Sequence, residues 1–420
     1  MISVDEALTA ILARCPVMPI VDASILDALG QVVAMDIRAP FDVPPLTNAA
    51  MDGYALRAAD ALDATDEQPT RLLVIEDLPA GRCAVKHVEA GTAIRIMTGA
   101  PLPEGADTVV QFEATGEGRG EPRANFVNIY SPPDHGINIR RAGEDLRLGD
   151  TILSRGTPLR PAEIGILATM GYATVPVHRR PRVGILSTGD ELLAPGAEWS
   201  PGKIYDANSY TLSAMVTRAG GIPIRLGVAP DRVEALIELI RGADGLDLLV
   251  TSAGVSVGDY DVVKHALASL GEISFYQVRM RPGRPLAFGS LLGIPLIGLP
   301  GNPVASAISF ELFGRPAILR MLGRAQLDRL SVRATLDDRV DNRDGRRSYY
   351  RVRLARNGDG YVARLTGPQG SGILRSMALA DGLMVIDEGT LSAGPGDIVT
   401  VQLLANPGDS YRDFDSLPVG

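Results

Sequence analysis

The sequence LDLLVTSAGVSVGDYDVVKHAL, residues 246–267, consists of a short apolar run, a glycine-rich loop and a segment with the apolar spacing of a helix. The sequence IPLIGLPGNPVASAISFELF, residues 294–313, has the same three parts in the same order. Each pattern predicts a strand, a loop and a helix. Backbone N–H groups in such a loop and in the first turn of the following helix attract an anion, typically phosphate.

The first of these loops differs from the nucleotide-binding loop GxxxxGK[ST], because it contains no lysine. It contains Asp259 and Asp261 instead. Carboxylates beside a phosphate site indicate a bridging Mg²⁺ ion.

The surrounding region, from Arg182 to Leu322, alternates apolar runs with helical segments. This rhythm predicts a parallel sheet that is buried on both faces by helices. Ligands of such sheets bind at the carboxyl ends of the strands. We therefore expect STGDEL (residues 187–192), the glycine-rich loop of residues 252–261 and GLPGNP (residues 298–303) to converge at one edge. Considered one at a time, each glycine of these loops is explained as well by an ordinary turn as by ligand binding.

Two further segments near this edge carry polar side chains. Asp206 and Asn208 precede a helical pattern, where capping of the helix explains one of them and ligand binding is open for the other. Arg281 and Arg284 flank a Pro–Gly turn, and paired guanidiniums suit a carboxylate, phosphate or oxyanion. The alternation around Gln277 is equally typical of an exposed edge strand.

Composition restricts the class of protein. A chain of 420 residues is long enough for two to four domains. The 41 basic against 50 acidic residues argue against a general role in binding nucleic acid or a membrane surface. Cys15 and Cys83 are too few for a disulfide framework or a cysteine-rich zinc site, which favours a reducing compartment, and we expect both thiols to be buried. The four scattered histidines give little support for a histidine metal site.

The amino-terminal sequence MISVDEALTAIL has acidic residues where a secretory signal has basic ones, and no apolar run approaches the length of a membrane span. We therefore expect a cytoplasmic protein. Residues 3–39 have a helical pattern that begins with a capping box of Ser3 and Glu6.

Alternating apolar and polar segments predict β-structure on both sides of the sheet region. The expected domains are a helical and mixed linking domain (1–43 and 145–180), a small β-rich domain (44–144), a three-layer α/β/α domain (181–326), a β-barrel (327–405) and a flexible tail (406–420).

Two polar segments outside the sheet region are ambiguous. TNAAMDGYAL (residues 47–56) places Asp52 in an Asp–Gly pair, which is also typical of a plain turn. INIRRAGEDLRLGD (residues 137–150) contains Asp145 and is equally compatible with ion pairs in a surface turn.

Taken together, the sequence resembles the MoeA family of molybdopterin molybdenumtransferases, which includes the carboxy-terminal domain of gephyrin. The segments that carry the resemblance occur in the family's order, and they are TNAAMDGYAL, RIMTGAPLPEGADTVVQFE, INIRRAGEDLRLGD, RVGILSTGDEL, KIYDANS, TSAGVSVGDYD, RPGRPLAFG and GLPGNPVAS. The resemblance implies a sheet domain of molybdopterin-binding type and insertion of molybdate into adenylated molybdopterin, with Mg²⁺ as cofactor and AMP as product. It also implies a homodimer whose active cleft combines the sheet domain of one subunit with the AMDGYA-bearing domain of the other.

The resemblance assigns residues by motif. The implied catalytic residues are Asp52, Asp145, Glu191, Asp231 and Asp261. The Mg²⁺ ligands would be Asp190, Glu191 and Asp261. The resemblance also implicates Thr98, Arg351 and Ser371. Together with residues of the segments described above, the predicted substrate-binding residues are Thr98, Asp190, Asp206, Asn208, Gly254, Ser256, Gly258, Arg281, Arg284, Pro300, Gly301, Asn302, Arg351 and Ser371.

The sequence departs from the family at Gln277, Arg281 and Arg284, where members often carry lysines. Arginine retains the charge for oxyanion binding but cannot act as a deprotonatable amine. Two alternative functions stay open at this level: molybdopterin adenylylation by the sheet domain, and a scaffold of the same fold without turnover. Transient contacts with an adenylyltransferase and with cofactor-accepting enzymes are further expectations, whereas the choice between molybdate and tungstate is not decided by the sequence.

Overall fold

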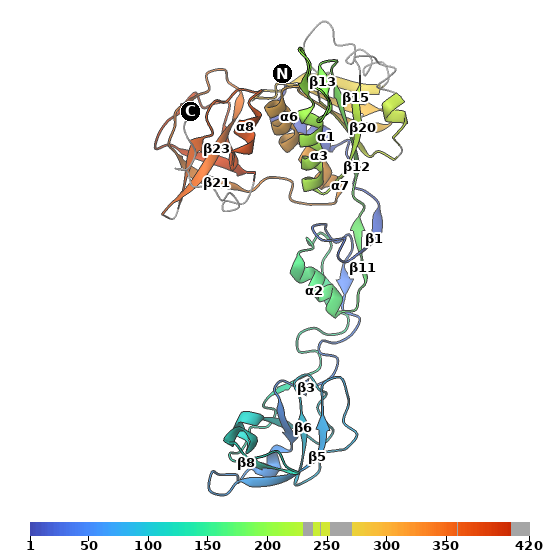
Figure 1. Cartoon of the computed structure of the whole chain (residues 1–420), viewed down its shortest axis with the longest axis vertical. Helices are drawn as coiled ribbons and strands as arrows, with labels where there is room; N and C mark the ends of the chain where they lie inside the picture. Colours follow the sequence, from blue (N-terminus) through green and yellow to red (C-terminus); the bar gives the residue numbers. More distant parts are fainter. Residues whose placement is uncertain (230–237, 244, 253–270, 359, 405–420) are drawn as a thin grey trace. The chain divides into compact units, whose positions relative to one another are not determined.

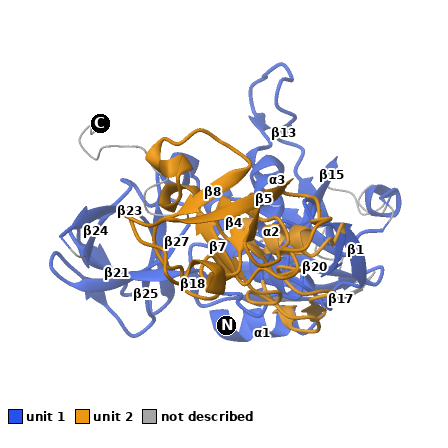
Figure 2. Cartoon of the chain, turned by 90° about the horizontal axis from the view of Figure 1, so that it is seen from below, with its two compact units in different colours: residues 1–34, 158–160, 174–420 blue, residues 35–157, 161–173 orange. Residues whose placement is uncertain are grey.

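The computed structural model describes residues 1–229, 238–243, 245–252, 271–358 and 360–404 (Figure 1). The chain divides into two compact units (Figure 2). Unit 1 comprises residues 1–34, 158–160 and 174–420, and unit 2 comprises residues 35–157 and 161–173. Within the described residues, no helix is long and apolar enough to cross a membrane.

Unit 2 is built on a five-stranded sheet with the order β7-β4-β6-β5-β8. Its strands are β4 (Gly53–Leu56), β5 (Thr70–Leu78), β6 (Thr92–Ile96), β7 (Thr108–Gln111) and β8 (Phe126–Ile129). Smaller elements of unit 2 are the pairs β3 (Asn48–Ala49) with β9 (Ile139–Arg140) and β2 (Ile37–Arg38) with β10 (Thr151–Leu153), the 3₁₀ helices η1 (Ala58–Ala61), η2 (Phe112–Ala114) and η3 (Glu117–Arg119), and the helix α2 (Pro161–Thr169). The predicted β-structure of this region is confirmed.

Gly53, in the AMDGYA motif, is required by close packing at the start of β4. A Cβ at this position would lie 2.1 Å from the carbonyl oxygen of Val110 on the neighbouring strand β7. The motif therefore has a structural requirement for glycine, independent of any role of Asp52.

Unit 1 contains a six-stranded central sheet with the order β15-β12-β16-β20-β19-β17. The strands are β12 (Arg182–Thr188), β15 (Ile222–Ala229), β16 (Leu248–Ser252), β17 (Gly271–Gln277), β19 (Pro285–Leu291) and β20 (Ile294–Leu299). Ile185 and Leu186 belong to hydrophobic clusters on opposite faces, so the prediction of a sheet buried on both faces is confirmed. The first cluster is completed by α3 (Ala207–Ala219), α6 (Pro303–Ser309), the π-turn η4 (Phe310–Gly314) and α7 (Arg315–Met321).

The prediction that this sheet is parallel throughout is wrong at one edge. β19 runs antiparallel to β20, and β17 runs antiparallel to β19. The reason is the connection: Leu292 and Gly293 have φ angles of 52° and 80° and join β19 directly to β20. Two residues form a hairpin turn, whereas a parallel crossover needs a dozen or more.

The amino-terminal helix is shorter than predicted. α1 (Val4–Leu12) has the expected capping box of Ser3 and Glu6, but the helical prediction is wrong from residue 13 to residue 39. Pro16 and Pro19 interrupt the pattern, and β1 (Ile20–Ser24) then pairs antiparallel with β11 (Thr174–His178).

The two cysteines also differ from expectation. Cys15 is buried three residues after the end of α1, and burial raises the pKa of its thiol to about 11. Cys83 is exposed, so the prediction of two buried thiols is wrong for it. Cys83 lies in the loop between β5 and β6, where no paired strand covers it.

The carboxy-terminal region forms a closed five-stranded barrel, as predicted. β21 (Ser331–Leu336), β23 (Arg347–Asn357), β24 (Gly360–Leu365), β25 (Gly382–Ile386) and β27 (Ile398–Leu403) pair in the order β23-β24-β21-β27-β25, and β25 pairs back with β23. The short strand β18 (Met280–Arg281), which follows the central sheet's β17, pairs with β23. Shorter elements of unit 1 are β13 (Leu192–Leu193) with β14 (Ile204–Tyr205), β22 (Val340–Asp341) with β26 (Ser392–Ala393), and α8 (Leu374–Ala378).

Candidate functional site

Unit 1 contains a cavity of about 800 Å³ between the carboxyl-terminal edge of the central sheet and the barrel. Its sheet side is lined by Thr188 at the end of β12, Ser252 at the end of β16 and the segment 300–303 after β20. Its barrel side is lined by residues 348–351 and 369–371. The cavity therefore lies where open α/β sheets bind ligands.

Hydrogen bonds fix the sheet side of the cavity. Asn208 donates from Nδ2 to Ser252 Oγ at 2.6 Å and to the Gly301 carbonyl at 2.7 Å. It therefore ties the start of α3 to the last residue of β16 and to the loop that follows β20. Asp206 caps α3, because its Oδ1 accepts from the Ser209 N–H at 3.0 Å and from Ser187 Oγ at 3.1 Å. Capping explains Asp206, whereas Asn208 has the different role of joining three segments.

Glu191 is the exposed carboxylate of the cavity lining. Among the described residues, no hydrogen-bond partner of its side chain is found. Asp190 does not line the cavity, and its carbonyl accepts from Lys203 Nζ. Pro300, Gly301 and Asn302 line the cavity as a group.

Four guanidinium groups line the same cavity, from Arg281, Arg284, Arg346 and Arg351. Arg284 donates from Nη2 to Gln277 Oε1 at 2.6 Å. The turn between Arg281 and Arg284 needs glycine: Gly283 has a φ of 104°, and a Cβ there would lie 2.5 Å from Ser309 Oγ. The two arginines predicted from the Pro–Gly turn thus share a cavity with two from the barrel.

Arg351 is the most buried of the four, with 1% of its surface exposed. It donates from Nε to Ser376 Oγ at 3.0 Å and from Nη2 to the Gly370 carbonyl at 3.1 Å. No ion pair of Arg351 with a carboxylate is found among the described residues, and burial lowers its pKa to about 10. A buried cation without a counter-ion at a cavity wall is suited to an anionic ligand.

Ser371 lies on the same wall, and its carbonyl accepts from the Val304 N–H at 3.0 Å. This hydrogen bond joins the barrel's QGSG segment to α6 of the sheet region. The structure thus brings Arg351 and Ser371 together with Glu191, Asp206, Asn208, Arg281, Arg284, Pro300, Gly301 and Asn302.

In unit 2, the structure brings Asp52 and Thr98 together. Asp52 Oδ1 accepts from the backbone N–H and from Oγ1 of Thr98, both at 2.7 Å. These hydrogen bonds lower the pKa of the exposed Asp52 carboxyl. Asp145 is also exposed, and its backbone N–H donates to the Val43 carbonyl.

Five of the predicted residues lie outside the described part of the chain. They are Asp231, Gly254, Ser256, Gly258 and Asp261. Among the residues that are described, no group of three or more His, Cys, Asp or Glu side chains could hold a metal ion.

Sequence patterns missed Arg346, which lies directly before β23. The basic pair in DGRRSYY, residues 344–350, at the edge of a predicted strand was the available signal. Nothing local to that sequence indicates that Arg346 lies near the Pro–Gly turn some sixty residues earlier, since pairing of β18 with β23 brings the two segments together.

Comparison with known proteins covers nearly the whole chain. Residues 2–171 match the family model for the MoeA N-terminal region (domain I and II), residues 184–320 match a probable molybdopterin binding domain, and residues 333–404 match the MoeA C-terminal region (domain IV). A relative from Mycobacterium tuberculosis named molybdopterin molybdenumtransferase 2 is 39% identical over 376 residues, covering 88% of this chain and 91% of that protein. The chain belongs to the MoeA family.

Other members of the MoeA family support the assignment. The molybdopterin molybdenumtransferase of Haemophilus influenzae is 33% identical over 411 residues, covering 96% of this chain and 98% of that protein. The crystal structure of the molybdopterin biosynthesis MoeA protein from Pyrococcus horikoshii matches with a TM-score of 0.81 and 34% identity, covering 96% of this chain and 99% of that one. The resemblance found in the sequence motifs is therefore confirmed.

Proposed function

We propose that this protein inserts molybdate into adenylated molybdopterin and releases AMP and the molybdenum cofactor. The observation that carries the proposal is the cavity where Arg281, Arg284 and Arg351 meet beside Glu191. Both substrates are anionic, and guanidiniums bind oxyanions and phosphates through directed hydrogen bonds.

The protein's own groups supply binding and orientation. Arg281 and Arg284, on one turn, hold the molybdate dianion together with Arg351 and Ser371, which line the same cavity. The segment of residues 300–303, which Asn208 binds at the Gly301 carbonyl, presents backbone groups to the pterin phosphate. Ordering both substrates in one cavity replaces an encounter between two separate molecules, which lowers the entropic part of the barrier. No protein nucleophile is required.

The Glu191 side chain is suited to bind Mg²⁺, because the ion prefers carboxylate oxygens and this carboxylate has no hydrogen-bond partner among the described residues. Asp261 lies outside the described residues, and Asp190 does not line the cavity, so the proposal for a metal rests on Glu191. When bound, Mg²⁺ would neutralise charge on the phosphate oxygens as AMP leaves.

We further propose that Asp52, Thr98 and Asp145 act in the same reaction and are supplied by a second copy of the chain in a homodimer. The enzyme would be cytoplasmic and would contact an adenylyltransferase and cofactor-accepting enzymes transiently. A mixture of an Asp52→Asn protein with an Arg351→Met protein tests the shared site. Heterodimers should recover one intact site and part of the activity, and recovery that stays at zero in purified heterodimers would contradict the proposal.

The function is tested with purified protein, adenylated molybdopterin, molybdate and Mg²⁺. The expected result is release of AMP that depends on molybdate, with strong loss of rate in Glu191→Gln. AMP release that fails in the wild-type protein would refute the proposal. Binding of the pterin without turnover would indicate a scaffold, and consumption of ATP with metal-free molybdopterin would indicate an adenylyltransferase.

A further inference from the structure

The basic wall of the cavity contains an ion pair that the proposed reaction has not used. Arg346 donates from Nε to Asp344 Oδ2 at 3.0 Å, and its Nη2 contacts the same oxygen. Arg281 Nη1 lies 3.9 Å from that oxygen. Arg281 and Arg346 line the cavity, whereas Asp344 does not. One oxygen of Asp344 therefore interacts with the guanidiniums of two arginines that line the cavity, although Asp344 itself lies outside the lining.

The turn that carries this pair is built to hold it. Gly345, between Asp344 and Arg346, has a φ of 66°, a conformation that favours glycine. Asp344 Oδ1 accepts from the Arg346 backbone N–H at 3.3 Å. The carboxylate is ionised, since the hydrogen bond from Arg346 lowers its pKa below the ordinary range.

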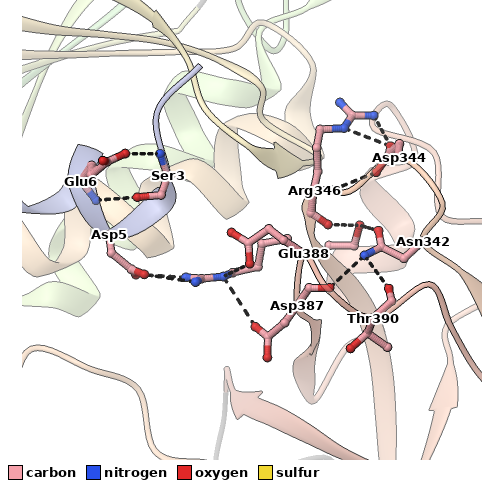
Figure 3. Close-up of polar contacts among 11 residues, drawn as sticks. Ser3, Asp5, Glu6, Asn342, Asp344, Arg346, Asp387, Glu388 and Thr390 are labelled. Atoms are coloured by element: carbon pink, nitrogen blue, oxygen red, sulfur yellow. Dashed lines mark hydrogen bonds and ion pairs between the residues drawn. The ribbon is translucent and has the colours of Figure 1, made fainter.

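Other contacts hold the residues on both sides of this turn in place (Figure 3). The next residue, Arg347, binds both oxygens of Asp5 in α1 at 3.0 and 3.1 Å and lies 3.4 Å from Glu388. Asn342 is fully buried and donates to the carbonyls of Asp387 and Thr390 at 3.1 Å. The backbone of the turn is therefore held from both sides, while the side chains of Asp344 and Arg346 are 32% and 26% exposed. This ion pair is partly accessible, and Arg346 lines the cavity, so a ligand in the cavity can reach it.

We propose that Asp344 is a built-in counter-ion of the substrate site, which an anionic group of the substrate replaces on Arg346 and Arg281. This inference rests on the proposed function and adds Arg346 as an anion-binding residue and Asp344 as a residue that sets selectivity. A monoanion gains little by replacing a carboxylate of equal charge, whereas a dianion such as molybdate gains a second unit of attraction. Asp344 thereby disfavours the abundant monoanions of a cell more than the substrate.

Isothermal titration calorimetry of the full-length protein with molybdate tests the inference. Asp344→Asn keeps the turn's hydrogen-bond acceptor and removes the charge, and it should bind molybdate roughly threefold to fivefold more tightly. Arg346→Ala should bind it more weakly by a similar factor, and Arg346→Lys should retain most of the affinity. In an Arg346→Ala background, the change Asp344→Asn should raise the molybdate affinity by a smaller factor than in the wild-type protein, because one of the two arginines that Asp344 contacts is gone.

Asp337→Asn is the matched control, since Asp337 pairs with Arg364 on the same barrel but does not line the cavity. It should leave molybdate affinity unchanged. Competition by nitrate should become stronger in Asp344→Asn than in the wild-type protein, an effect that a purely structural role would not produce. Unchanged or weaker molybdate binding in a folded Asp344→Asn protein would overturn the inference. A wild-type protein that binds no molybdate would instead overturn the proposed function on which the inference depends.

Discussion

Replacement of Arg351 by methionine should weaken anion binding in the cavity strongly while leaving the fold intact. Arg351 is the largest fully buried side chain of the described residues, and it has no carboxylate partner there. Methionine has a similar length and fills the same space without charge. The substitution therefore separates anion binding from packing.

The expected change in stability follows from two opposing terms. Burial lowers the pKa of Arg351 to about 10. A free guanidinium has a pKa of about 12.5 or higher, so the charged form loses about 3 kcal/mol in the folded protein. Methionine removes this penalty, but it also removes the hydrogen bonds to Ser376 and Gly370. Two hydrogen bonds from a charged donor contribute about 3–6 kcal/mol together, so the two terms largely cancel and the free energy of unfolding should fall by no more than about 3 kcal/mol.

The expected change in ligand binding is a strong loss of affinity. Loss of one charge-assisted contact to a dianion corresponds to a fall of about tenfold to a hundredfold in affinity. Differential scanning calorimetry measures the stability of unit 1, and titration calorimetry with molybdate measures the affinity. Arg333→Met is the control, because Arg333 is an exposed arginine of the barrel that does not line the cavity.

Two results would refute the reasoning. Destabilisation by more than about 3 kcal/mol would mean that Arg351 stabilises the barrel, as one member of a buried polar network does. Unchanged molybdate affinity in a folded Arg351→Met protein would mean that the guanidinium does not bind the anion.

Two further predictions concern unit 2. In Thr98→Val the pKa of the Asp52 carboxyl should rise part of the way to its ordinary value, because one of two hydrogen bonds to the ionised form is lost; NMR titration of the carboxyl carbon measures this. Because the pKa of Asp52 is lowered in the folded protein, the hydrogen bond stabilises the fold only when the carboxyl is ionised. The wild-type protein should therefore be more stable than Thr98→Val above about pH 4, and the difference should disappear as the pH falls through the folded pKa. Equal stability of the two proteins at neutral pH would contradict this. Gly53→Ala should destabilise unit 2 by about 3 kcal/mol or more, because the added Cβ meets the Val110 carbonyl, and a calorimetric Tm close to that of wild type would show that β4 can move aside. The matched control Gly165→Ala, in α2 with no heavy atom within 4 Å of the added Cβ, should stabilise the helix by about 0.5–1 kcal/mol.

Some failures of prediction have a common physical origin in contacts between distant parts of the chain. The apolar pattern of residues 285–299 is compatible with either strand direction, and the two-residue turn at Leu292 and Gly293 makes it antiparallel. The residues after Leu12 have an apolar spacing that suits a helix, but pairing of β1 with β11 gives them a sheet partner from residues 174–178. In both cases hydrogen-bonded pairing outweighs a weak local preference.

Features that depend on neighbouring residues could be predicted from the sequence. The capping box at Ser3, the strand and helix around GLPGNP and the alternation of the barrel strands follow from backbone preference and the period of burial, which are local properties. Family motifs in addition predicted individual residues of the site. Tertiary structure alone decided which charges meet: the closing pair β23 and β25 and the contact of β18 with β23 bring Arg346 and Arg351 to the turn of Arg281. Electrostatic interactions depend on distance through space, so no local pattern encodes that Asp344 lies behind two arginines of the cavity.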